Sequence, residues 1–256
     1  MTAVASVLMI TAGISWSTTY ILIIRQGFRD RTYGMPIAAL CANISWEFIF
    51  SFVLPQMWRQ RVIDIAWLGL DVIIWSQALR FGPKEFPHMP KRVFYAMFGF
   101  TQAVAFGTVL AITHEFKDWN GYYAAYGQSL MMSALFLVML YSRRSLRGQS
   151  MGIAVTKMIG TALVSIAFTV HPLEHAHSVL LPFLYVACTI LDVAYVGAVY
   201  MVGRAASAQA RELAAPAPAS APAWPATTDR SAPATTDRPA PATPGRGNLG
   251  SYRHVR

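Results

Sequence analysis

The sequence predicts an all-α protein, a polytopic integral membrane bundle of seven transmembrane helices with its N-terminus outside and its C-terminus in the cytoplasm. Three observations predict this fold class: an apolar composition, seven apolar runs of suitable length, and basic residues concentrated in alternate loops. Hydrophobic residues make up 55% of the 256 residues, charged residues 13%, and the mean hydropathy is +0.39. These values include a polar C-terminal stretch, so the remaining chain is too apolar for an ordinary soluble domain.

Seven apolar runs approach the roughly 20 residues that a helix needs to cross a bilayer. The third run is interrupted by Asp64 and Asp71. The first run has no basic n-region and no short cleavage site, which predicts a retained helix rather than a signal peptide. The runs are Ala3 to Ile24, Met35 to Leu54, Val62 to Leu79, Val93 to Thr113, Tyr122 to Tyr141, Met151 to Val170 and Val179 to Val202.

Lys and Arg residues are distributed unequally between the two sets of loops. The first, third and fifth loops hold ten of them, whereas the second, fourth and sixth hold three. Cytoplasmic loops are enriched in Lys and Arg, so this bias predicts the orientation stated above, in a multi-pass protein of the cell membrane. The net charge of +9 follows from the same bias and from contact with anionic lipid headgroups, and it does not indicate nucleic-acid binding.

Composition divides the chain into a seven-helix domain, residues 1–204, and an Ala/Pro/Thr-rich tail, residues 205–256. Within the tail the sequence PATTDR occurs at Pro225 to Arg230 and again at Pro233 to Arg238. Such a segment buries too little apolar surface to offset its ordering entropy, which predicts a disordered cytoplasmic tail without a part in the chemistry. Cys41 and Cys188 both fall within apolar runs, so a disulfide framework is not indicated.

The second apolar run contains the sequence NISWEF, which places Glu47 in the middle of the membrane. A carboxyl group at that depth costs about 2.5 kcal/mol or more, so Glu47 is predicted to face the bundle interior and to mark a functional site. Helical geometry puts Asn43 one turn before Glu47 and Trp46 beside it, so an amide and an indole ring can reach the same pocket. The alternative is a protonated Glu that only links helices.

Three acids on different helices share one predicted depth. Counted from the cytoplasmic ends of their helices, Glu47 lies roughly 18 Å, Asp192 roughly 15 Å and Asp71 roughly 13 Å into the membrane. Each buried acid is costly alone, so their alignment indicates a common site. We predict that Glu47, Asp192 and Asp71 are catalytic, and that Asp192 either shares a proton with Glu47 or accepts the final proton as a base.

Aromatic and polar side chains accompany these acids at helical spacing. Aromatic rings stabilise cations by about 2 kcal/mol or more when desolvated. The alternative for such stripes, above all on the fourth and fifth runs, is lipid contact or core packing. The predicted substrate-binding residues are Asn43, Trp46, Asp64, Trp67, Trp75, Tyr95, Gln102, Phe106, Tyr185 and Tyr195.

Buried carboxyl groups in aromatic, water-poor surroundings indicate chemistry that begins with protonation. An apolar environment favours the neutral form of a carboxyl group, and a carboxylate nearby favours it further, so one acid remains a proton donor at neutral pH. Such a site can protonate a weakly basic lipid and then hold a carbocation away from water. These properties are those that terpene cyclisation requires.

The same residues resemble a known family. NISWEF, the third-run sequence WLGLDVIIWSQALRFG and ILDVAYVGAVY around Asp192 are similar to the membrane-bound terpene cyclases of meroterpenoid and indole-terpenoid biosynthesis. The resemblance covers residues 3–204, and Trp46, Glu47 and Asp192 match its intramembrane WE pair and its intramembrane Asp. It implies protonation of a terminal epoxide or alkene on a prenylated aromatic or indole substrate, with farnesyl as the expected chain, followed by ring closure. The choice of epoxide or alkene, the chain length, the head group and the oligomeric state are left open.

No cofactor or metal is predicted. Neither a DDxxD nor a DxDD stretch occurs, so no Mg²⁺ site is implied. The outer loop holds His171, Glu174, His175 and His177, which is rich in potential metal ligands. The loop is short, exposed and begins with a Pro, so solvated side chains are the preferred interpretation.

A small transporter and a retinal photoreceptor are the two alternatives to a cyclase. Pro55 and Gln56 resemble the PQ motif of seven-helix carriers, which makes a small transporter the alternative function. The motif is single, however, and has no counterpart in the other half of the chain, where a parallel repeat would place one. A retinal photoreceptor is disfavoured because the seventh run lacks Lys, and Lys157 is the one intramembrane candidate for a Schiff base.

Overall fold

The computed structural model describes residues 3–171 and 177–214. All regular secondary structure in this part of the chain is helical, without strands. The elements are α1 (Ala3–Asp30), α2 (Ile37–Phe48), the π-helix η1 (Ile49–Val53), α3 (Trp58–Glu85), α4 (Lys91–Glu115), α5 (Tyr122–Arg143), α6 (Met151–Val170) and α7 (Leu180–Ala214). The all-α prediction is confirmed, and each predicted run corresponds to one of these helices.

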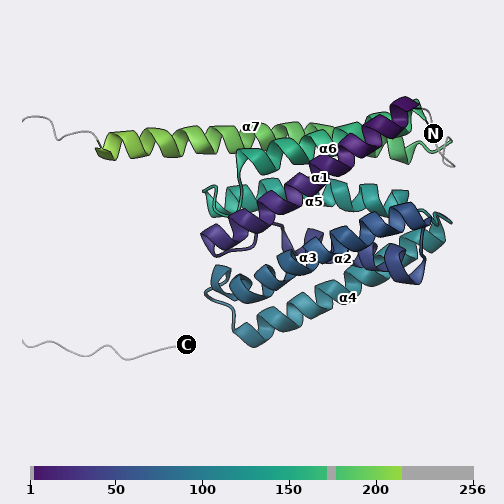
Figure 1. Cartoon of the computed structure of the whole chain (residues 1–256). Helices are drawn as coiled ribbons and strands as arrows, with labels where there is room; N and C mark the ends of the chain where they lie inside the picture. The colour runs from purple at the N-terminus through teal and green to yellow at the C-terminus, as the bar shows by residue number, and fades with distance from the viewer. Residues whose placement is uncertain (1–2, 172–176, 215–256) are drawn as a thin grey trace, which may run out of the picture. The chain divides into compact units, whose positions relative to one another are not determined.

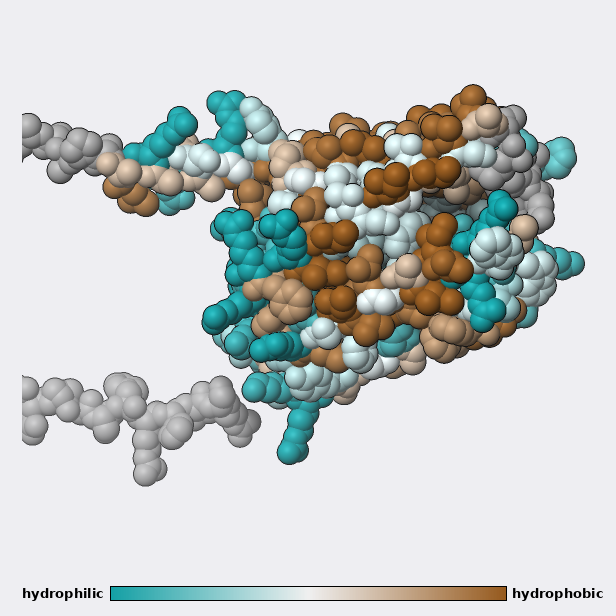
Figure 2. Space-filling model, viewed as in Figure 1, coloured by the Kyte–Doolittle hydropathy of each residue, from teal (hydrophilic) through white to brown (hydrophobic). Residues whose placement is uncertain are grey.

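Six of the described helices, α1 and α3 to α7, are long and apolar enough to cross a membrane. Large apolar side chains are exposed at helical spacing on α1 at Val7, Ile10 and Ile14, and on α7 at Phe183 and Ile190, as lipid-facing helices require. Figure 2 shows such side chains over the middle of the helical unit and hydrophilic ones toward its ends. The chain is therefore a multi-pass membrane protein. Its orientation and a seventh crossing remain predictions.

The second predicted span is the short apolar segment Ile37–Val53, which ends in the π-helix. Pro36 is the N-cap of α2, and its φ of −56° suits the start of a helix. Glu47 and Phe48 lie directly before η1. Turns of π-helix are found mostly inside α-helices and frequently at functional sites, so the wide turn occurs beside the acid that the sequence singles out.

The short helix α2 is surrounded by others and contacts α3, α4 and α5. A second group forms where α6 contacts both α1 and α7. Figure 1 shows α6 and α7 on one side of α5, and α2, α3 and α4 on the other, with α1 running obliquely across α5. The two groups meet through contacts of α5 with α2 and α7, and of α1 with α3, so residues of both can face the same interior.

Close approach of α1 and α6 depends on Gly160. A Cβ atom at this position would lie 2.7 Å from the Trp16 ring. Small residues let membrane helices pack closely, and here the absence of a side chain gives the Trp16 ring its place between the two helices.

The last helix is longer than the sequence indicates. Residues 205–214, which were assigned to the disordered tail, are an exposed helical continuation of α7. The reason is local, because this stretch is rich in Ala, Gln, Arg and Glu, which are strong helix formers. Residues 215–256 lie outside the described part of the chain, so the dispensability of the tail stays a prediction.

Candidate active site

Besides Asp118 in the turn before α5, four acidic side chains are buried, all of them on helices: Glu47 on α2, Asp64 and Asp71 on α3, and Asp192 on α7. Glu47 is 3% exposed and the other three are 0% exposed. Each has one buried carboxyl oxygen without a hydrogen-bond partner among the described residues. Buried polar atoms in native proteins almost always have partners, and a bound proton or a substrate group would account for these oxygens.

Asn43 joins three other helices to α2. Its Nδ2 donates to Oδ2 of Asp71 at 2.7 Å and also to the hydroxyl group of Tyr20. Gln128 on α5 donates to Oδ1 of Asn43 at 3.2 Å. The spacing of Asn43 and Glu47 predicts that both reach one pocket. The hydrogen bonds seen for the Asn43 amide go to Asp71, Tyr20 and Gln128 instead of Glu47. Asn43 thus holds one oxygen of Asp71 and leaves Oδ1 unpaired.

Glu47 interacts electrostatically with both Asp71 and Asp64, and Tyr20 interacts with all three acids. Gln60 donates to Oδ1 of Asp64 at 2.7 Å. We call Tyr20, Asn43, Glu47, Asp64 and Asp71 the acid cluster. Carboxyl groups that share a low-dielectric site cannot all ionise at little cost, so this cluster is suited to retaining a proton.

A row of three aromatic rings borders the acid cluster. Tyr20 stacks on Trp67, with ring centroids 6.4 Å apart and an interplanar angle of 20°. The ring centroid of Trp16 lies 6.4 Å from that of Tyr20. Nε1 of Trp67 donates a hydrogen bond to the Ser17 hydroxyl group at 3.0 Å. Trp67 is among the substrate-binding residues predicted from the sequence, whereas Trp16 and Tyr20 are not. Their i, i+4 spacing on the first run was the available signal.

Asp192 lies in a second polar group, with a lysine. Nζ of Lys157 on α6 is 2.5 Å from Oδ1 of Asp192 and donates to the Ser133 hydroxyl group at 2.7 Å. Nζ also lies 5.8 Å from the centroid of the Trp16 ring and 6.0 Å from that of Phe136. The partner of Asp192 is therefore Lys157. The hydrogen bond to Glu47 that was one of two hypotheses is not seen among the described contacts.

Gln102, Trp75 and Trp46 stabilise the surroundings of α2. Gln102 accepts from Nε1 of Trp75 at 3.3 Å and donates to the Ser45 hydroxyl group at 2.7 Å. Nε1 of Trp46 donates to the carbonyl oxygen of Gly121 at 3.0 Å. These bonds anchor α2 to α3, α4 and the turn before α5, and substrate contact by these residues stays a prediction.

Tyr195 and Tyr185, the two residues of α7 predicted to bind substrate, lie in two different apolar clusters. The Tyr195 hydroxyl group donates to Oε1 of Gln149 at 2.8 Å, and its fully buried ring belongs to the core. Tyr185 packs on Tyr126 with centroids 4.5 Å apart, in a separate apolar cluster. Their contacts are those of packing residues.

Of the two predicted aromatic residues of α4, Tyr95 is exposed, whereas Phe106 is partly buried against an apolar cluster that includes Trp46. Tyr95 is 46% exposed, and its hydroxyl group donates to the carbonyl oxygen of Leu79 at 3.3 Å. Phe106 lies 6.3 Å from the ring of Phe48, which is itself 44% exposed. None of the bonds or ring contacts seen for these residues reaches the four buried acids.

The described residues contain no group of three or more His, Cys, Asp or Glu side chains that could hold a metal ion. The histidine-rich loop falls largely outside them, since residues 172–176 are not described. Gln56 of the PQ pair donates to the carbonyl oxygen of Asn120 at 2.8 Å. This bond gives Gln56 a structural role between the end of η1 and the turn before α5.

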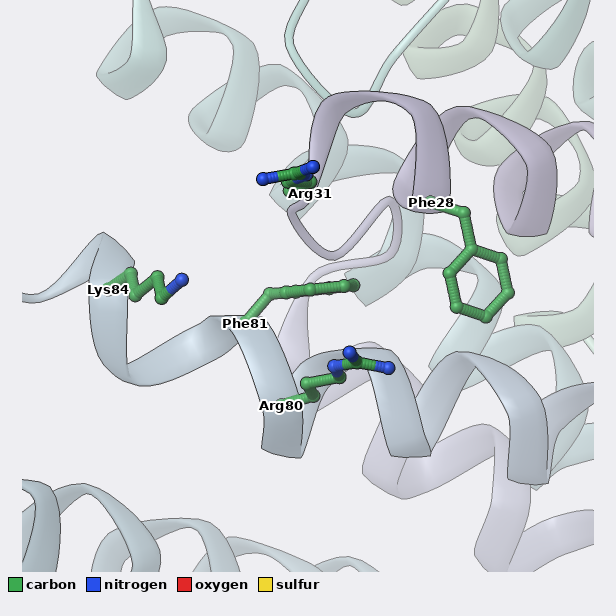
Figure 3. A pocket seen from close by; sticks show the side chains of 5 residues that line it. All are labelled: Phe28, Arg31, Arg80, Phe81 and Lys84. Atoms are coloured by element: carbon green, nitrogen blue, oxygen red, sulfur yellow. The ribbon is translucent and has the colours of Figure 1, made fainter.

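A separate pocket of about 410 Å³ lies at the ends of α1 and α3 that carry basic residues. Figure 3 shows its lining side chains: Phe28, Arg31, Arg80, Phe81 and Lys84. It contains none of the four buried acids, so it is distinct from the candidate site.

Comparison with known proteins identifies the family of this chain. Residues 1–205 match the family model of Pyr4-like transmembrane terpene cyclases. The Pyr4-family terpene cyclase mfmH of Annulohypoxylon moriforme is 31% identical over 201 residues, which cover 73% of this chain and 82% of the relative. The terpene cyclase pyr4 of Aspergillus fumigatus is 28% identical over 217 residues, covering 77% and 86%. No solved structure matches. The chain belongs to the Pyr4-like transmembrane terpene cyclases.

Proposed function

We propose that this membrane terpene cyclase protonates a terminal epoxide or alkene on a farnesyl-bearing aromatic or indole substrate, and that Glu47 is the proton donor. The observation that carries the proposal is the state of the Glu47 carboxyl group. It is 3% exposed, its Oε2 has no hydrogen-bond partner among the described residues, and it lies in electrostatic range of Asp71 and Asp64. Membership of the cyclase family supports this function over the PQ-type transporter.

Glu47 is a better candidate for the donor than Asp71. One oxygen of Asp71 accepts a hydrogen bond from the Asn43 amide, whereas no such bond is seen for Glu47. Hydrogen bonds to a carboxylate favour its charged form. Within the acid cluster the proton is therefore more available from Glu47, and a positioned acid of this kind contributes roughly 10²- to 10⁴-fold to the rate.

The reaction balances as an isomerisation. The O–H bond of Glu47 breaks. On an epoxide, a new O–H bond forms and a C–O bond of the ring breaks; on an alkene, its π electrons form a new C–H bond. Alkene π electrons then form the ring C–C bonds, and loss of a proton from carbon leaves a new C=C bond. The aromatic row of Trp16, Tyr20 and Trp67 offers ring faces that stabilise the intermediate cation by about 2 kcal/mol or more in the absence of water.

The test uses membranes that contain the full-length protein, incubated with farnesyl-indole and with its terminal epoxide. Mass spectrometry and chromatography detect products of unchanged mass and altered retention. Glu47→Gln keeps the size and hydrogen bonding of the side chain but removes the acid, and we expect cyclised product to vanish. Glu115→Gln is the matched control on an exposed residue. Substantial turnover by Glu47→Gln at equal membrane content would overturn the assignment of the donor.

A further inference from the structure

The second polar group joins three helices around one buried cation. Lys157 of α6 is 0% exposed, and its Nζ contacts Asp192 of α7 at 2.5 Å and Ser133 of α5 at 2.7 Å. The side chains of the ion pair are 0% and 1% exposed. Such a pair is weak grounds for stability, because desolvation of two charges offsets most of their attraction. The pair lies near Trp16, which neighbours Tyr20 of the acid cluster. A role in catalysis therefore explains the buried pair better than a role in stability.

The two oxygens of Asp192 differ. Oδ1 is held by the Lys157 ammonium group, whereas Oδ2 is buried without a hydrogen-bond partner among the described residues. A cation in contact favours the ionised form of a carboxyl group. Nζ of Lys157 therefore holds one oxygen of Asp192, and the other oxygen is left to accept a proton.

Aromatic rings connect the surroundings of Asp192 to the acid cluster. Nζ of Lys157 lies 5.8 Å from the centroid of the Trp16 ring, and Trp16 is followed in the row by Tyr20, which bonds to Asn43. The proton donor and the carboxylate thus belong to two groups connected through aromatic rings.

We infer that Lys157 is a positioning residue which holds Oδ1 of Asp192 and orients the carboxyl group, so that Oδ2 of Asp192 accepts the proton lost in the last step of cyclisation. In that step a C–H bond next to the cation breaks, its electron pair forms the C=C bond, and the proton binds Oδ2. Return of one proton from Asp192 to Glu47 restores the starting enzyme. This inference rests on the proposed function and decides between the two roles that the sequence left open for Asp192.

The test compares substrate consumption with product identity in membranes containing four variants: Asp192→Asn, Lys157→Met, the double variant with both changes, and Lys157→Arg. Glu47 is intact in all four, so we expect substrate consumption to continue. Asp192→Asn, Lys157→Met and the double variant should release one shared set of alternative alkenes and water-quenched alcohols, because residues that act as a unit lose function non-additively. Lys157→Arg retains a cation and should restore the wild-type product as the major one.

Several outcomes would overturn the inference. A purely structural ion pair predicts that Lys157→Met makes less of the wild-type product with unchanged product ratios. Loss of all consumption in Asp192→Asn and in the double variant would place Asp192 before ring closure. Misrouted products from membrane-inserted Lys157→Arg would show that the cation is not what Asp192 requires.

Two design features keep the result interpretable. The double variant leaves no unpaired buried charge, so it reports on the pair even where a single variant fails to accumulate. Failure of the proposed function has a different signature, since the wild-type protein would then consume neither substrate or Glu47→Gln would remain active.

Discussion

The amide of Asn43 and the carboxyl group of Asp71 lie 2.7 Å apart, and their hydrogen bond connects α2 to α3 in the acid cluster. The same amide donates to the Tyr20 hydroxyl group of α1, so one side chain aligns three helices. Glu47 follows Asn43 by one helical turn. The orientation of the proposed donor is therefore tied to a bond that Glu47 does not itself make.

The first prediction concerns the Asn43–Asp71 hydrogen bond. Asn43→Leu removes the donor from a buried carboxyl group, a loss of about 1.5 to 3 kcal/mol for a bond to a charged group. We expect turnover to fall roughly tenfold or more, since about 1.4 kcal/mol in the barrier is tenfold in rate. Asp71→Asn should lower turnover in part, and the double variant should be no worse than the poorer single one, because the two residues share one bond. Additive losses would contradict this coupling.

The second prediction tests the aromatic row. Trp67→Leu removes the ring that stacks on Tyr20 and with it a cation-stabilising face of about 2 kcal/mol, so cyclised product should form roughly thirtyfold more slowly. Trp58→Leu is the matched control, because Trp58 is 70% exposed. The measurement is the initial rate of product formation per inserted protein. Equal rates in the two variants would argue against a catalytic contribution of the row.

The third prediction concerns the contact of α1 with α6. Gly160→Ala places a Cβ atom 2.7 Å from the Trp16 ring, whereas nothing lies within 4 Å of a Cβ atom added at Gly197. Overpacking of this kind costs roughly 1 to 3 kcal/mol. The Gly160 variant should lose its folded state at a lower temperature in detergent, as measured by thermal aggregation, whereas Gly197→Ala should match the wild type. Indistinguishable transitions would show that Trp16 can move aside freely.

The fourth prediction concerns the C-terminal segment. The family match ends at residue 205, and α7 ends at Ala214. A chain terminated after Ala214 retains the whole helix, so it should insert into membranes and form product at the wild-type rate. Product formation per inserted protein is the measurement. An inserted but inactive truncated chain would reveal a role for residues 215–256.

Hydropathy by itself determined where the helices lie, because membrane-spanning length and apolar character are local properties of the chain. The predicted run Met151 to Val170 coincides with α6, and Val93 to Thr113 falls within α4. The burial of Glu47, Asp71 and Asp192 could also be predicted, because a carboxyl group within an apolar run must avoid lipid. The end of α7 was missed, because helix propensity continued the helix beyond the change in composition.

Only the tertiary structure decided which polar groups meet. Similar depth suggested that Asp192 pairs with Glu47, but depth leaves the rotation of each helix and the identity of its neighbours undetermined. Packing of α6 against α7 brings Lys157 to Asp192. Packing of α3 against both α2 and α1 brings Asn43 within hydrogen-bond distance of Asp71 and Tyr20. The physical reason is that a side-chain contact requires two helices to present the right faces at a short distance, and that arrangement results from packing of the whole bundle.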